Sequence, residues 1–221
     1  MVRASAAFVR FAPFGAFILA LALRGALQGS SLVDARWLYA AQVVGAGAVL
    51  LVFHRRYLEL RSRPATANAW ALAAVAGAAV FYIWVRATSP WMTLDSAAAT
   101  FEPVRSNGDL DWPLIGLRMA GAVLVVPVME ELFWRSFVMR WIDRRDFLAL
   151  APQNSSFRAL ALSSAVFALA HPLWFAGLIA GLTYGWLYRT TGSLWFPIGA
   201  HALTNLLLGA WVIDQKAWGF W

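Results

Sequence analysis

Seven long apolar stretches constrain the fold of this chain more than any other feature. They raise the hydrophobic share to 61%, against the roughly 45–50% usual in soluble domains. A membrane-spanning helix needs about 20 residues, so 221 residues hold about seven such helices and no separate soluble domain. We therefore expect an all-α, polytopic membrane helical bundle that forms one domain over residues 1–221. The stretches fall at 11–28, 36–53, 68–86, 113–141, 158–174, 175–189 and 194–213.

Arginine is unevenly distributed between the two sides of this topology. If the N-terminus is cytoplasmic, that side carries eleven arginines and the other side four arginines and one lysine, as the positive-inside rule requires. We therefore attribute the net charge of +7 to the arginines that orient the chain in the membrane. No basic run is interleaved with aromatic residues, so we expect no nucleic-acid partner. The cytoplasmic arginines are Arg3, Arg10, Arg55, Arg56, Arg61, Arg63, Arg140, Arg144, Arg145, Arg158 and Arg189.

Two adjacent carboxylates and a guanidinium lie in the fourth stretch, in the sequence EELFWR at 130–135. Ionisable groups within a membrane segment are functional-site candidates by default. On a helix, Glu131 and Arg135 are one turn apart and can pair, whereas Glu130 points about 100° away from Glu131. Glu130 is therefore the candidate catalytic base. Arg118, earlier in the same stretch, is expected to snorkel or pair.

Two later stretches carry polar groups at the same helical spacing. Phe167 and His171 are four residues apart, so the aromatic ring can pack beside the imidazole and hold its orientation. His201 and Asn205 are also four residues apart, and together they can direct a ring N–H and an amide N–H at one substrate atom. The three polar sets predict a shared intramembrane cavity.

A proline lies near each polar set, and each proline removes a backbone N–H donor. Within a helix, Pro127 would leave the carbonyl of Val123 without its donor, and Pro172 would do the same to Ala168. Pro197 either frees a carbonyl in this way or sits in a first helical turn, where it costs little. Kinks at these positions would open space between helices, which favours a water-accessible cavity.

The motifs EExxxR at 130–135, FxxxH at 167–171 and HxxxN at 201–205 together resemble the CAAX prenyl endopeptidase-like family of intramembrane proteases, also called CPBP or Abi. The motif-bearing core covers about 113–210. The resemblance implies a conical cavity and hydrolysis of a peptide bond in a membrane protein or lipidated peptide. Ser136 departs from the pattern, because many members have glycine there. The sequence EELFWRSF is also similar to a bacterial, exosortase-associated CAAX prenyl protease-related subgroup, which implies the bacterial inner membrane.

The resemblance also implies a role for each motif residue. Glu130 activates the attacking water, assisted by His171, while His201 and Asn205 stabilise the oxyanion. Supporting positions are Glu131, Arg135 and Phe167.

Metal dependence stays open at this stage. Glu130, His171 and His201 could form a zinc site of two histidines and one glutamate, or act without metal. We favour metal-free water activation, because Asn205 is a good oxyanion donor and a weak zinc ligand. The chain has no cysteine, no GxSxG and no HExxH, so those protease classes fit poorly.

Two other classes of function also stay open: an ion- or proton-coupled transporter whose buried charges form a relay, and a non-catalytic membrane scaffold or immunity protein. The oligomeric state and the natural substrate cannot be read from the sequence.

Overall fold

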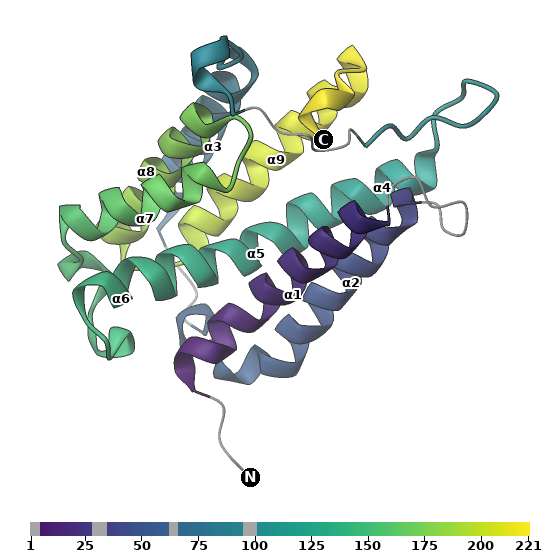
Figure 1. Cartoon of the computed structure of the whole chain (residues 1–221). Helices are drawn as coiled ribbons and strands as arrows, with labels where there is room; N and C mark the ends of the chain where they lie inside the picture. Colours follow the sequence, from purple (N-terminus) through teal and green to yellow (C-terminus); the bar gives the residue numbers. More distant parts are fainter. Residues whose placement is uncertain (1–4, 28–34, 62–65, 95–100) are drawn as a thin grey trace.

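The computed structural model describes residues 5–27, 35–61, 66–94 and 101–221. Arg3 and Arg63, two of the arginines used for orientation, lie outside these ranges. Within them, helices occupy all seven predicted stretches (Figure 1), which confirms the all-α bundle. The helices are α1 (Ala6–Ala26), α2 (Ala35–Phe53), α3 (Ala67–Arg86), α4 (Trp112–Ala120), α5 (Val126–Glu131), α6 (Arg140–Asp143), α7 (Phe157–Leu169), α8 (Trp174–Thr191) and α9 (Trp195–Gln215).

Five helices of the described ranges are long and apolar enough to cross a membrane: those at 6–26, 36–56, 67–86, 112–143 and 195–215. Large apolar side chains on their outer faces are strongly exposed, with Leu19 at 72% and Val52 at 74%. Such side chains suit contact with lipid, where apolar exposure carries no penalty. The chain is therefore an integral membrane protein.

The fifth stretch ends earlier than the sequence predicts. Helicity is expected over 158–174, but α7 stops at Leu169, because Pro172 cannot donate to Ala168 and disfavours helical geometry at the residue before it. Pro172 therefore lies in the turn between α7 and α8 and not within a helix. The 13 residues of α7 extend only about 20 Å, less than the apolar thickness of about 30 Å. Its C-terminal end can thus lie at membrane depth.

The continuous helix over 112–143 is the centre of the bundle. It comprises α4, α5 and α6, joined by π-helical segments at Gly121–Val125 and Leu132–Met139. In Figure 1 it runs between α1 and α2 on one side and α3, α7, α8 and α9 on the other. Its 32 residues extend about 48 Å at 1.5 Å per residue. As predicted from its length, it must tilt in a bilayer or project beyond it.

Close helix approach brings α3 and α9 together around the centre of α9. A Cβ added to Gly77 would lie 2.5 Å from the Ala200 carbonyl oxygen, so only glycine fits. The Thr204 hydroxyl, one turn further along α9, lies 2.8 Å from the Gly77 carbonyl oxygen and accepts a 2.7 Å hydrogen bond from the Tyr184 hydroxyl of α8. This junction joins three helices beside the predicted site.

Small residues also bring α7 against α8. A Cβ added to Gly181 would be 2.9 Å from the Ser164 Cβ, and one added to Gly177 would be 3.2 Å from the Ala168 Cα. Glycines four residues apart form one face of a helix and allow close packing in a membrane. This face fixes the end of α7, and with it the position of His171.

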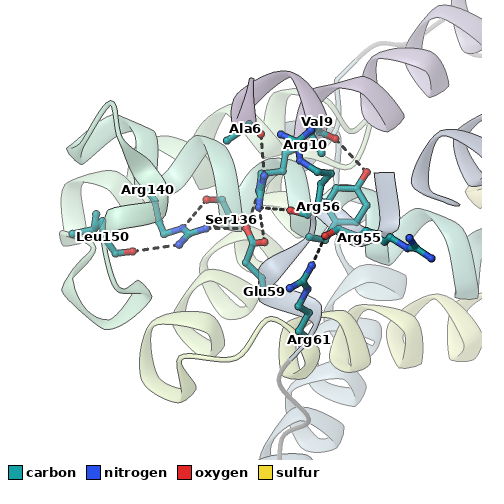
Figure 2. Close-up of polar contacts among 11 residues, drawn as sticks. Ala6, Val9, Arg10, Arg55, Arg56, Glu59, Arg61, Ser136, Arg140 and Leu150 are labelled. Atoms are coloured by element: carbon teal, nitrogen blue, oxygen red, sulfur yellow. Dashed lines mark hydrogen bonds and ion pairs between the residues drawn. The ribbon is translucent and has the colours of Figure 1, made fainter. Parts of the chain in front are cut away.

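A buried ionic cluster connects α1 to the C-terminal part of the long helix (Figure 2). Glu59 accepts hydrogen bonds from Arg10 Nε at 2.8 Å and Nη2 at 2.6 Å, and from Arg140 Nη2 at 3.1 Å. The Ser136 hydroxyl donates to Glu59 and accepts from Arg140 Nη2 at 2.7 Å. Ser136 therefore contacts both Glu59 and Arg140 within this cluster.

The same cluster buries two of the arginines that were counted for orientation. Arg10 and Arg140 were assigned above to the cytoplasmic side as orienting charges, but they are only 1% and 4% exposed. Burial is possible because Glu59 supplies a carboxylate to both guanidinium groups. In the structure these two arginines pair with Glu59.

Candidate active site

A cavity of about 120 Å³ lies where the long helix, α8, α9 and the turn after α7 meet. At about 30 Å³ per water molecule it has room for roughly four. All four predicted catalytic residues line it, together with Phe167, so the structure brings the three motifs into one site. The lining residues are Trp84, Val126, Glu130, Phe167, His171, Ala180, Tyr184, His201, Thr204 and Asn205.

Glu131 is a fully buried carboxylate between two partners. Its Oε2 is 3.1 Å from Arg135 Nε, which confirms the ion pair expected from helical spacing. The N–H direction falls outside hydrogen-bond geometry, so this contact is an ion pair only. Its Oε1 lies 3.0 Å from His201 Nδ1, a long-range contact that helical spacing does not predict. Glu131 therefore fixes the ring of His201 as well as Arg135.

Both histidines have the same ring nitrogen engaged. His171 Nδ1 lies 2.8 Å from the Phe167 carbonyl oxygen, as His201 Nδ1 lies beside the Glu131 carboxylate. A carbonyl and an ionised carboxylate only accept hydrogen bonds, so Nδ1 carries the proton in each ring. Nε2 of each histidine is left as the atom that can contact a molecule in the cavity.

Glu130 differs from its neighbour in having no such partners. It is 8% exposed, and its Oε2 is buried without a hydrogen-bond donor from the described parts of the chain. Its charge lies close enough to His171 to interact with that ring electrostatically. A buried carboxylate oxygen without a donor is costly, so Glu130 is the group best placed to accept a proton from a molecule held in the cavity.

Asn205 contacts the long helix through a defect beside Pro127. In the π-helical segment the Val126 N–H bonds the carbonyl of Gly121, five residues earlier. The next donor in this register would be residue 127, which as proline has none. The Ala122 carbonyl instead accepts a 2.7 Å hydrogen bond from Asn205 Nδ2. An amide nitrogen carries two hydrogens, so one remains for a ligand.

This defect changes one prediction about the prolines and settles another. The carbonyl that a side chain caps belongs to Ala122, one residue before the predicted Val123, because π-helical pairing spans five residues where α-helical pairing spans four. Pro197 lies in the first turn of α9, where its missing donor costs little. The register change beside Pro127 is thus the proline-linked defect that borders the cavity, through Val126 and Asn205.

Aromatic rings hold the charged groups in place. The Phe167 ring lies 4.4 Å from the His171 ring, as the spacing predicts, and the Arg135 guanidinium lies 4.5 Å from the centre of Phe167. Tyr184 stacks on His201 at 5.1 Å, and Trp84 meets His171 edge to face at 5.6 Å. Neither Tyr184 nor Trp84 belongs to a motif from which it could be predicted. The glycine spacing at 177, 181 and 185 could have shown that α8 lies close to the site.

The alternative zinc set shares the cavity without being arranged as ligands. Within the described residues, no group of three or more His, Asp or Glu side chains is placed to hold a metal ion.

The part of the chain that forms most of this cavity matches a known protein family. Residues 112–207 match the family model for the type II CAAX prenyl endopeptidase Rce1-like proteins, and the matched range contains all three motifs. Searches of curated proteins and of solved structures found no match to the chain. The long helix, α7, α8 and most of α9, which hold most cavity residues, thus match the Rce1-like type II CAAX prenyl endopeptidases.

Proposed function

We propose that the cavity hydrolyses a peptide bond in a membrane protein or lipidated peptide, with Glu130 activating the attacking water. One observation carries the proposal. The unpartnered carboxylate of Glu130 shares a buried cavity with two histidines whose Nδ1 atoms are already engaged. Such a site offers a proton acceptor and two free ring nitrogens in a space that holds a few water molecules.

In the proposed first step, Glu130 takes a proton from water while the water oxygen adds to the substrate carbonyl carbon. His171 assists by holding the water through Nε2. The tetrahedral intermediate then breaks its C–N bond, and the proton passes from Glu130 or His171 to the leaving amine. The reaction consumes one water and yields a carboxyl and an amino group.

The developing oxyanion would accept hydrogen bonds from His201 and Asn205. Since Nδ1 of His201 already donates to Glu131, Nε2 can donate only when the ring is an imidazolium. The Glu131 carboxylate stabilises that cation, and the second amide hydrogen of Asn205 completes the pair. Removing one such donor typically lowers kcat by about 10²–10³-fold.

A cleavage assay tests the proposal directly. The purified protein in phosphatidylcholine vesicles is given a farnesylated CAAX peptide carrying a fluorophore and a quencher. We expect cleavage by the wild type and a loss of about 10²–10⁴-fold in kcat for Glu130→Gln, the usual contribution of a general base. Glu102→Gln is the matched control, because Glu102 is an exposed carboxylate outside the cavity. Wild-type kcat in Glu130→Gln would contradict the proposal.

The other function classes give different outcomes in the same vesicles. A transporter would leave the peptide intact and show a proton or ion flux that Glu130→Gln abolishes. A scaffold would show neither cleavage nor flux, and Glu130→Gln would retain its cellular function. Glu130→Gln also serves as a trap, because a substrate that binds without being cleaved can be crosslinked and identified.

We further propose a cytoplasmic N-terminus, on the basis of the arginine bias, in the bacterial inner membrane that the subgroup resemblance implies. The chain contains no cysteine, so single cysteines introduced at exposed positions near the ends of α1 can be labelled with a membrane-impermeant reagent. Labelling from the periplasm near Ser5 would contradict this orientation.

A further inference from the structure

A second cavity of about 180 Å³ adjoins the first along the long helix. The two cavities share Val126 and Asn205 as a common wall. The second cavity extends away from Glu130 towards the N-terminal end of α4 and the C-terminal residues of the chain. It is lined by Phe17, Tyr39, Arg118, Ala122, Val126, Asn205, Leu208, Phe220 and Trp221.

One face of the long helix borders both cavities. Residues 118, 122 and 126 line the second cavity, and 126 and 130 line the first. Residues four apart lie on one face of a helix, so Arg118 and Glu130 mark the two ends of a single stripe. A ligand lying along this stripe would contact both cavities at once.

Arg118 is a charged group without a counter-ion in the described ranges. No carboxylate there forms an ion pair with it, and its buried Nε has no hydrogen-bond acceptor. Three rings surround its guanidinium, those of Tyr39 at 4.4 Å, Phe101 at 5.3 Å and Trp221 at 5.9 Å. The charge of Arg24 lies close enough to repel it. Arg118 was expected to snorkel or pair, and among the described residues its neighbours are aromatic rings and the Tyr39 hydroxyl.

The Tyr39 hydroxyl lies close enough to hydrogen-bond the Arg118 side chain, but the buried Nε donor has no acceptor among the described residues. An intramembrane arginine without an anion is costly and marks a functional site by default. The planar fork of its N–H groups matches a carboxylate bidentately. The cavity beside Arg118 therefore has the charge, the shape and the space to receive a carboxylate.

We propose that the second cavity is a substrate subsite in which Arg118 binds a carboxylate of the substrate while the scissile bond lies at Glu130. The proposal rests on the function proposed above and adds a specificity to it. Twelve residues separate Arg118 from Glu130, or about 18 Å along the helix. The length of the arginine side chain shortens this span. At about 3.3–3.6 Å per extended residue, the carboxylate would lie roughly three to six residues from the scissile bond.

Paired peptides test the subsite. Each quenched fluorescent peptide carries Asp or Asn at one position three to six residues from the scissile bond, on either side, and is assayed in phosphatidylcholine vesicles. At one position we expect kcat/KM to be about ten- to hundred-fold higher for Asp, the range of a charged hydrogen bond. Arg118→Gln should reduce the ratio of Asp to Asn kcat/KM to about one, and Arg118→Lys should restore part of it.

A matched control and a binding measurement separate this subsite from the catalytic proposal. Arg86→Gln removes another arginine that lies over a ring, that of Tyr82 at 5.4 Å, on an exposed part of α3, and should keep the full preference. Binding of the same peptides to Glu130→Gln protein measures the Asp preference without turnover. If no peptide is cleaved, the catalytic proposal fails while this binding ratio still decides the subsite.

Three outcomes would overturn the subsite. The first is equal binding of Asp and Asn peptides at every position, and the second is an Asp preference that survives Arg118→Gln. The third is a preference that phosphatidylglycerol vesicles abolish by competition, which would assign Arg118 to a lipid phosphate.

Discussion

Glu131→Gln tests whether two adjacent glutamates have different roles. The amide keeps the size of the side chain but removes a charge 3.1 Å from Arg135 Nε and 3.0 Å from His201 Nδ1. The side chains of Glu131, Arg135 and His201 are 0%, 2% and 8% exposed, so solvent screens these contacts little. Breaking a buried pair by removing one partner costs about 3–5 kcal/mol.

We expect the lower end of that range, a loss of about 3 kcal/mol in the free energy of unfolding. The amide oxygen can still accept from His201, and Arg135 keeps its contact with the Phe167 ring at 4.5 Å. We also expect kcat to fall by about 10²–10³-fold, because the His201 imidazolium loses its counter-charge and with it the Nε2 donor to the oxyanion.

Glu130→Gln is the control for this experiment, because it makes the same change at the next residue. Glu130 has no ion pair among the described residues, so we expect its unfolding free energy to stay within about 1 kcal/mol of the wild type or to rise. The kcat of Glu130→Gln should nevertheless fall by about 10²–10⁴-fold. The two substitutions are thus expected to differ in their effect on the free energy of unfolding, although both lower kcat.

Unfolding is followed by circular dichroism during titration of mixed micelles with dodecyl sulfate, and kcat is measured with the CAAX peptide in vesicles. Equal destabilisation by the two substitutions would refute the assignment of Glu131 as the paired glutamate. If Glu131→Gln has wild-type stability and wild-type kcat, the contacts of Glu131 with Arg135 and His201 contribute neither to folding nor to catalysis, and the reasoning is refuted.

Three further predictions concern the cluster in Figure 2, helix packing and metal. Burial favours a raised pKa for Glu59, but hydrogen bonds and charge from Arg10 and the bond from Ser136 hold that pKa below its ordinary value. Its stabilisation is thus present above the unfolded pKa, near 4.5, and lost as pH falls through the folded one. The stability difference between wild type and Glu59→Gln, about 3–5 kcal/mol at pH 7, should shrink in acid titrations. Gly77→Val should lower the thermal midpoint and the cleavage rate together, because its side chain meets the Ala200 carbonyl, whereas Gly45→Val, at a glycine with open space, should not. Chelation should leave cleavage unchanged, and stoichiometric zinc needed for turnover would contradict this.

The parts of the site that the sequence predicts are those set by local geometry. Glu131 and Arg135 lie on one turn, as do Phe167 and His171, so helical spacing alone brings each pair together. The contact between Glu131 and His201 joins residues 70 positions apart. Periodicity cannot predict such a contact, because it depends on how α9 packs against the long helix. Tyr184 and Trp84 were missed for the same reason.

The connection between the cavities depends on one change of helical register that sequence rules do not predict. With regular α-helical pairing, Pro127 would release the carbonyl of Val123. The π-helical segment moves the released group to Ala122, which meets Asn205 on α9. Because Asn205 borders both cavities, the hydrogen bond that caps this defect also holds the wall between Glu130 and Arg118. The sequence predicts only a kink at Pro127. In the structure, the register change beside Pro127 lets Asn205 face the proposed oxyanion on one side and the proposed carboxylate subsite on the other.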